Sequence, residues 1–222
     1  DFSFVLSDGT YWPASNWGVS GIARDAQPNR THIDLDYADL SMVAKVLQSL
    51  PAPTQLQDAM AKWNPQGQVR EFQMQWSSSI DYSVRGQLTK LVLLPQPAMH
   101  GVGLPGVQGL NSTFEFNARG GKASLDMQAG TLQFPGVFEE PSIPFDVLQA
   151  QLHWSFDNEN IKVEIEQAQF ENLDAKGLVH GMWRTGDTDV DRLPGYLHIQ
   201  GILERADGAR VHRYLPLAVP ET

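Results

Sequence analysis

Apolar and polar residues alternate along most of the chain, which is typical of β-strands that have one apolar face. In the clearest run, residues 148–156, Leu, Ala, Leu, Trp and Phe alternate with Gln, Gln, His and Ser. The same period of two predicts strands at 72–76, 80–88, 114–116, 122–128, 161–166, 31–37, 173–183 and 196–203, with weaker ones near 2–7 and 17–24. The fold is therefore predicted to be mainly β.

Two turns join neighbouring runs closely enough to predict hairpins. Asp157–Asn160 separates two alternating runs and reads as a four-residue loop. Arg119-Gly120-Gly121 closes another hairpin in the same way. Consecutive strands joined by short turns pair antiparallel, so we expect a long, twisted antiparallel sheet with an apolar concave face.

Only residues near 40–63 have helical spacing, and they predict two short helices. The first has apolar residues at 40, 43, 47 and 50, with Asp39 or Ser41 as its cap, and ends at Pro51. The second opens at Thr54, has Gln57 three residues later, and ends before Pro65. We expect an α+β arrangement in which these helices are an insertion between strands.

A short repeat suggests how the chain is organised. Ala38-Asp39 is followed by Val, Lys and Leu at fixed spacing, and Ala206-Asp207 is followed by Val, Arg and Leu at the same spacing. Asp207 is expected to cap a helix, although Asp207-Gly208 is also a hairpin-turn signal. The chain is predicted to be one repeat segment, with strands at 1–37, a helical insertion at 38–66, strands at 67–205 and the start of the next repeat at 206–222.

Charge and composition exclude several classes of protein. The formal net charge is −10, which argues against a nucleic-acid partner because binding phosphates requires a basic surface. There is no cysteine, so disulfides and thiol chemistry are excluded. No apolar run approaches the ~20 residues that cross a bilayer. Since the chain opens with Asp1, it is expected to be a processed chain or an excised fragment.

Motifs that resemble active sites have simpler explanations. Gly101–Gly106 fits G-x-G-x-x-G, but prolines flank and interrupt it and a strand follows, so it is predicted to be a linker. Asp187, Asp189 and Asp191 open a calcium-loop spacing that Arg192 and His198 do not complete. Glu164 and Glu166 share a strand face, and solvent-facing charge explains them better than glycoside hydrolysis. We expect no enzyme activity, metal or cofactor.

The apolar faces of the strands are the remaining feature, and something must cover them. The simpler possibility is a core closed by a second layer; the other is a ligand with a long apolar surface, such as acyl chains. The side chains expected on this face are Phe114, Phe116, Leu125, Met127, Leu148, Leu152, Trp154, Ile161, Val163, Ile165, Val179 and Trp183.

Several phrases of the sequence, in this order, resemble the YhdP family of AsmA-like proteins. They are Asn64–Arg70 leading into Phe72–Trp76, Leu104–Leu110, Gly120–Ala123, Phe134–Pro141 and Val211–Pro216. The resemblance implies a large envelope protein of Gram-negative bacteria, anchored in the inner membrane and extending through the periplasm. It also implies a bridge-like lipid-transfer architecture, whose apolar groove carries phospholipids towards the outer membrane and supports its permeability barrier.

From this resemblance we expect an interior or C-terminal-side fragment whose apolar face contacts phospholipid acyl chains. The other expected partners are neighbouring repeats of the same polypeptide and envelope proteins. Two alternatives remain open: a non-enzymatic structural or protein-interaction β module of the envelope, whose apolar faces pack on each other, and a carbohydrate-active β-protein that uses Glu164 and Glu166.

Overall fold

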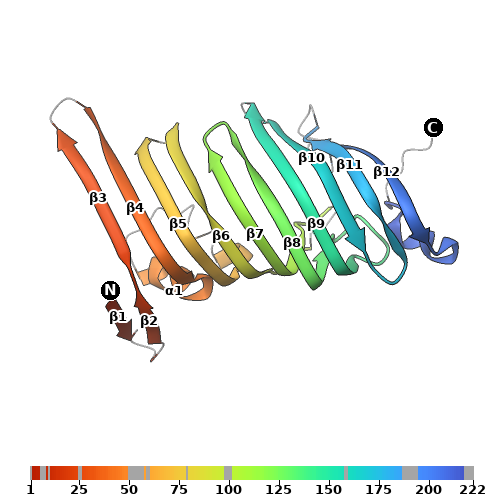
Figure 1. Cartoon of the computed structure of the whole chain (residues 1–222), viewed down its shortest axis with the longest axis horizontal. Coiled ribbons are helices and arrows are strands. Elements are labelled where there is room, and N and C mark those ends of the chain that lie inside the picture. Colours follow the sequence, from red (N-terminus) through yellow and green to blue (C-terminus); the bar gives the residue numbers. More distant parts are fainter. Residues whose placement is uncertain are drawn as a thin grey trace.

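A computed structural model describes residues 2–5, 9, 11–24, 27–49, 58, 61–78, 80–97, 102–157, 160–186 and 195–217. Ten of its strands form one antiparallel sheet in which each strand pairs with the next along the chain. The sheet is open, since β3 and β12 lie at its two edges (Figure 1). The prediction of a mainly β fold with a long antiparallel sheet is confirmed.

A separate hairpin of β1 (Phe2–Val5) and β2 (Tyr11–Ser15) precedes the large sheet. The strands of the large sheet are β3 (Trp17–Arg24), β4 (Gln27–Asp39), β5 (Gln66–Ser78), β6 (Asp81–Leu93), β7 (Gly106–Asn117), β8 (Gly120–Gln133), β9 (Ser142–Asp157), β10 (Asn160–Glu171), β11 (Ala175–Arg184) and β12 (Tyr196–Ala206). β9 ends at Asp157 and β10 begins at Asn160, so the loop predicted to have four residues is a two-residue connection. The turn is shorter because Asp157 and Asn160 pair with each other as the last rung of the ladder.

Aspartates begin both helical segments. Helix α1 (Leu40–Ser49) follows β4, and Asp39 Oδ1 accepts hydrogen bonds from the N–H groups of Ser41 and Met42. The 3-10 helix η1 (Gly208–Tyr214) follows β12, and Asp207 accepts from the N–H of Ala209. The two Ala-Asp sequences of the predicted repeat thus stand at equivalent strand-to-helix junctions. Of the second predicted helix, residues 58 and 61–63 are helical, and the rest lies outside the described residues.

The long strands do not run straight, because several contain an extra residue or a left-handed one. The pairing shifts between Arg70 and Gln73 in β5, between Leu88 and Leu91 in β6, and between Ile165 and Gln167 in β10. Positive φ angles occur inside the strands at Glu71 (49°), Lys90 (53°), Gly109 (83°) and Ala129 (52°). Bulges of this kind bend a strand and increase its twist.

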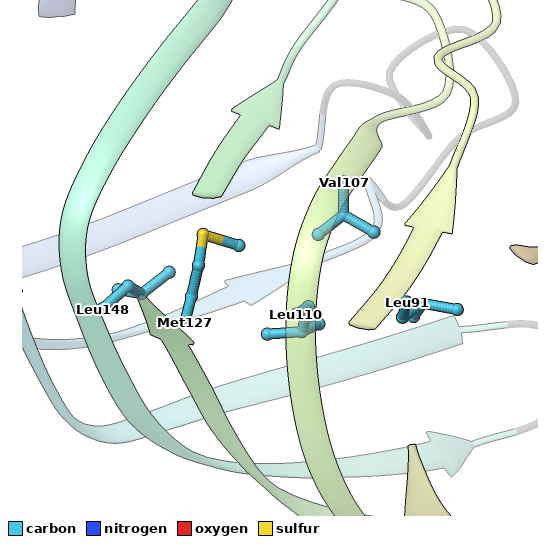
Figure 2. Packing of buried hydrophobic residues seen from close by; sticks show 5 residues of the cluster. All are labelled: Leu91, Val107, Leu110, Met127 and Leu148. Atoms are coloured by element: carbon cyan, nitrogen blue, oxygen red, sulfur yellow. The ribbon is translucent and has the colours of Figure 1, made fainter. Parts of the chain in front are cut away.

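Apolar side chains fill the inside of the bend. Leu91, Val107, Leu110, Met127 and Leu148 form one buried cluster, with Met127 fully buried. Figure 2 shows these side chains grouped where the strands curve around them. A second cluster joins Met42 of α1 to Leu35, Ala38 and Val69, so the helix covers part of the same face.

The two ends of the strands differ in what joins them. Short turns connect β5–β6, β7–β8 and β9–β10, and we call this the hairpin end. The connection from β11 to β12 also starts and ends there, since Arg184 pairs with Tyr196. At the opposite end, which we call the closed end, lie α1, the connections from β6 to β7 and from β8 to β9, and η1 (Figure 1). Backbone bonds join Gly103 N–H to Pro135 O and Leu217 N–H to Val137 O, and Gln96 Nε2 donates to Lys62 O. The closed end is therefore tied together across the sheet.

Candidate functional site

The strand register places apolar residues in rows that cross the sheet. Starting near the hairpin end, the first row runs through Val19, Ile33, Met74, Val84, Phe116, Gly121, Trp154, Val163, Trp183 and Leu197. The second runs through Trp17, Leu35 and Phe72 and, beyond the shift of register between β5 and β6, through Gly86, Phe114, Ala123, Leu152, Ile165, Gly181 and Ile199. These two rows cross all ten strands of the sheet.

Two further rows lie nearer the closed end, between β6 and β12. The third runs through Leu88, Ser112, Leu125, Ala150, Ala168, Val179 and Gly201. The fourth runs through Leu91, Leu110, Met127, Leu148, Phe170, Gly177 and Leu203. We call the surface formed by the four rows the apolar face. From β6 to β12 its rows contain no charged side chain, and Ser112 is the polar exception.

The residues predicted to line an apolar groove all lie on this face. Phe116, Trp154, Val163 and Trp183 are in the first row, and Phe114, Leu152 and Ile165 are in the second. Leu125 and Val179 are in the third row, and Met127 and Leu148 are in the fourth. Ile161 pairs with Phe156 on the hairpin side of the first row.

The prediction missed members of the face at both ends of the rows. Trp17, Val19, Ile33 and Leu35 extend the first two rows onto β3 and β4, although their alternation is visible in the sequence. Leu110 was missed although it follows the period of two set by Phe114 and Phe116. Phe170 was missed for another reason: a shift of register between Ile165 and Gln167 interrupts the alternation, and a strict period of two would place Phe170 on the opposite face.

Exposure divides the apolar face into a covered part and an accessible part. The fourth row is buried at Leu91, Leu110, Met127 and Leu148. Nearer the hairpin end, Phe114, Leu152 and Trp154 are half-buried, and Trp76 is 47% exposed. β12 is exposed along its whole length. Apolar surface therefore remains accessible towards the hairpin end and the β12 edge.

Aromatic rings in this face rest on glycines of the adjacent strand. A Cβ on Gly121 would lie 2.6 Å from Trp154 Cζ2, and one on Gly86 would lie 3.0 Å from Phe114 Cζ. The ring of Phe116 lies 6.4 Å from that of Trp154 and 6.0 Å from that of Phe114, measured between centroids. The glycines thus let neighbouring rings form one aromatic cluster over β7–β9.

The opposite face carries charged and amide side chains that pair across strands. Lys122 lies 3.3 Å from Glu115, and Arg85 Nε donates to Gln73 Oε1 at 2.8 Å. A hollow of about 1170 Å³ spans β3 to β9, and polar side chains of this face line it together with second-row residues such as Trp17 and Phe72.

The carboxylates considered for glycoside hydrolysis are engaged in ion pairs on the polar face. Glu164 lies 2.6 Å from Lys162 Nζ, and this hydrogen bond lowers the pKa of the Glu164 carboxyl. Glu166 lies in the β10 bulge and is 3.1 Å from His153 Nδ1. Both side chains are more than half exposed, and neither lines the hollow. Their surroundings are those of solvated surface charge.

A buried polar cluster fastens η1 to the closed end. Asp174, only 4% exposed, accepts hydrogen bonds from Arg213 Nη1 at 2.6 Å and from the Tyr214 hydroxyl at 3.0 Å. The hydrogen bond to Glu140 raises the pKa of Arg213, and burial raises the pKa of Tyr214. Asn172 Nδ2 donates to Tyr214 and to Pro144 O. The donors and acceptors of these side chains are hydrogen-bonded to one another. We therefore interpret the cluster as a structural latch that holds η1 in place.

The remaining motifs give no binding site among the residues that the structure describes. The Gly-rich stretch joins β6 to β7, where Gln96 and Leu104 form a bridge and a strand begins at Gly106. Asp187, Asp189 and Asp191 lie outside the described residues. Among the described residues, no group of three or more acidic or histidine side chains is placed to hold a metal ion. No helix in this part of the chain is long and apolar enough to span a membrane.

Comparison with known proteins connects the fold to one family. The family model described as YhdP protein matches residues 1–222. No curated protein and no solved structure matches the chain.

Proposed function

The chain belongs to the YhdP family, and from this membership we propose that it carries phospholipids along its apolar face between the inner and outer membranes. The membership is consistent with a bacterial envelope protein that transports lipids. In this proposal the chain is a periplasmic segment of a protein anchored to the inner membrane of a Gram-negative bacterium. Its activity supports the permeability barrier of the outer membrane.

The observation that carries the proposal is the continuity of the apolar rows. The first two rows cross ten strands, and successive strands lie about 4.8 Å apart, so the face is roughly 45 Å wide. Burying an acyl chain on such a surface contributes about 0.8 kcal/mol per CH₂. Because the face lacks charged side chains from β6 to β12, a bound chain has no fixed polar anchor and is free to slide from strand to strand.

The partners in this proposal are acyl chains and further strands of the same polypeptide. Among the described strands β12 pairs with β11 alone, and its apolar side chains Leu197, Ile199 and Leu203 are between 48% and 59% exposed. A neighbouring repeat that added a strand to β12 would extend the rows and lengthen the conduit. Envelope proteins that deliver or receive lipid are the remaining partners.

Photo-crosslinking on the two faces of β9 tests the proposal. A photoreactive residue at Leu152, on the apolar face, is expected to capture labelled phospholipid in cells that produce the full-length parent protein. The same residue at Gln151, on the polar face, is the matched control and is expected to capture none. Lipid captured at neither position, in a folded and abundant protein, would contradict the proposal.

The second candidate is a non-enzymatic structural or protein-interaction module, and the buried fourth row favours it. Leu91, Leu110, Met127 and Leu148 already cover one another at the bend, as they would in a closed core. Charged substitutions distinguish the two functions. Leu152→Asp and Val163→Asp should abolish transport in a protein that still folds if the face binds lipid, and should leave function unchanged if it is only a scaffold.

A further inference from the structure

The apolar face differs in composition from one end of the strands to the other. Six aromatic residues lie within three residues of the hairpin end of their strands, and we call them the aromatic band: Trp76, Tyr82, Phe116, Trp154, Phe156 and Trp183. The third and fourth rows, nearer the closed end, contain no Trp or Tyr: they are aliphatic residues and glycines except for Ser112, Met127 and Phe170, beside which Phe145 packs. From β5 to β12 the Trp and Tyr side chains of the face therefore lie at its hairpin margin, and its interior is mainly aliphatic.

The register makes the band continuous over most of its length. Trp76 pairs with Tyr82, and Phe116 is followed across β8 by Trp154. Val163 separates Trp154 from Trp183. The rings of Tyr82 and Phe116 meet edge to face with centroids 6.4 Å apart, which links the β5–β6 members to those on β7 and β9.

Burial indicates which end of the face admits water. Trp76 is 47% exposed and Phe156 is 40% exposed, and both belong to the band. From β6 to β9 the fourth row is buried, and α1 with the connections of the closed end lies beyond it. A polar group attached to a chain bound on this face thus reaches water at the hairpin end.

Trp and Tyr prefer the boundary between an apolar layer and water, because their rings are apolar and their N–H and O–H groups are polar. Trp154 lies six positions after Leu148 on β9, which corresponds to about 20 Å of strand. One leaflet of a bilayer has a hydrocarbon thickness of about 15 Å, half of the usual ~30 Å. The stretch of strand between the aromatic band and the buried Met127 cluster is therefore long enough to hold an acyl chain that spans one leaflet.

We infer that the aromatic band fixes the orientation of a bound phospholipid, with its headgroup at the hairpin end and its acyl chains directed along the strands towards the Met127 cluster. This inference rests on the proposed lipid-carrying function and adds the direction in which the lipid lies. The band residues act as positioning residues, since they set the depth at which the polar and apolar parts of the lipid meet.

Site-specific quenching in the full chain tests the orientation. The chain has no cysteine, so single-cysteine variants accept a fluorophore at one chosen position. Phe156→Cys reports from the band, Leu125→Cys from the third row and Gln151→Cys from the polar face, with Val179→Cys as a second third-row probe. Phosphatidylcholine carries a nitroxide quencher either in its headgroup or near the methyl end of an acyl chain.

The fluorophore at 156 is expected to be quenched at least twofold more by the headgroup nitroxide, and the fluorophore at 125 at least twofold more by the chain-end nitroxide. The opposite order, or equal quenching by both lipids at both positions, overturns the orientation while lipid binding stands. Absence of quenching above the Gln151→Cys control overturns the proposed function and this inference together.

A band variant separates positioning from simple packing. Trp154→Leu keeps an apolar side chain but removes the ring and its N–H group. In the Phe156→Cys background it is expected to reduce the headgroup-to-chain quenching ratio at least twofold, with an unchanged circular dichroism spectrum. An unchanged ratio would show that Trp154 only packs on Gly121 and does not position lipid.

Discussion

Gly121 is a position where the apolar face has no room for even a methyl group. An ideal Cβ there would lie 2.5 Å from both Glu115 O and Phe116 Cβ, in addition to its contact with Trp154. Gly121→Ala must therefore displace backbone or ring atoms, and we expect it to lower the free energy of unfolding by about 1–3 kcal/mol. Urea unfolding measures the loss.

Gly208 provides the matched control for this change. It lies in η1, and a Cβ added there has no other heavy atom within 4 Å. Gly208→Ala is expected to change stability by no more than about 0.5 kcal/mol. Equal urea midpoints for the two variants would show that the ring of Trp154 moves aside freely, and the aromatic cluster would then be loosely packed.

Arg213 contacts two carboxylates whose surroundings differ. Asp174 has a side chain that is 5% exposed, and it also accepts from Tyr214; the side chain of Glu140 is 54% exposed. Asp174→Ala leaves buried donors without an acceptor and should cost about 1–3 kcal/mol of unfolding free energy. Glu140→Ala removes a solvated ion pair and should cost less than about 1 kcal/mol.

Chemical denaturation of both variants, followed by circular dichroism, measures this difference. The latch joins η1 to the β10–β11 connection, so Asp174→Ala is also expected to increase proteolysis near residues 207–217. If the Glu140 variant proves the less stable of the two, the exposed pair is the one that holds η1 in place.

At the scale of single elements, the alternation of side chains predicted the strands well and their interruptions poorly. β9 was predictable because its alternation continues from Leu148 to Phe156 without a break. In β6, by contrast, Leu88 and Leu91 share a face although they are three positions apart, because the pairing shifts between them. Such a shift depends on the neighbouring strands, and a pattern read along one strand does not contain it.

Lys90 shows what the extra residue does. Its φ of 53° lies in the left-handed region, and its N–H donates to Asn111 Oδ1 at 3.0 Å. Lys90→Gly relieves the backbone strain but adds flexibility to the unfolded chain, so stability should change by less than about 1 kcal/mol. Deleting Lys90 should leave Leu91 on the same face as Leu88, two positions apart as in a regular strand, but it removes the bulge and the donor to Asn111, so we expect it to lower the free energy of unfolding by about 1–3 kcal/mol.

Thermal unfolding of the substituted and shortened chains distinguishes these outcomes. The substitution is the control for the deletion, since both remove the lysine side chain but only the deletion removes the extra residue. A deletion variant as stable as Lys90→Gly would mean that β6 pairs equally well without the bulge.

At the scale of the whole molecule, the sequence predicted the kind of surface better than its extent. The alternation and the family resemblance together indicated a long sheet with an apolar face, and the register places every predicted lining residue on that face. The width of the face, from β3 to β12, was not predictable, because it depends on each strand pairing with its successor. The contacts that tie the closed end together were not predictable either, because its hydrogen bonds join residues far apart in the sequence.

The two open edges have a consequence for the chain in solution. In the part of the chain that the structure describes, β3 and β12 each have one side that pairs with no other strand, and an exposed strand edge with apolar side chains is a template for pairing with another chain. Val19 on β3 is 70% exposed, and Ile199 on β12 is 48% exposed, and both belong to rows of the apolar face. We therefore expect the isolated chain to self-associate as its concentration rises, with edges of different copies pairing.

Adjacent substitutions on β12 test which feature of the edge drives this association. Ile199→Glu places a charge within the second row and should shift sedimentation towards the monomer, because continuing the row in a second copy would bury that charge. Gln200→Glu adds the same charge to the polar face and should leave the association unchanged. If both variants associate like the original chain, pairing of the strand backbones is enough to drive the association. If neither the original chain nor the variants associate, the edges of different copies do not pair.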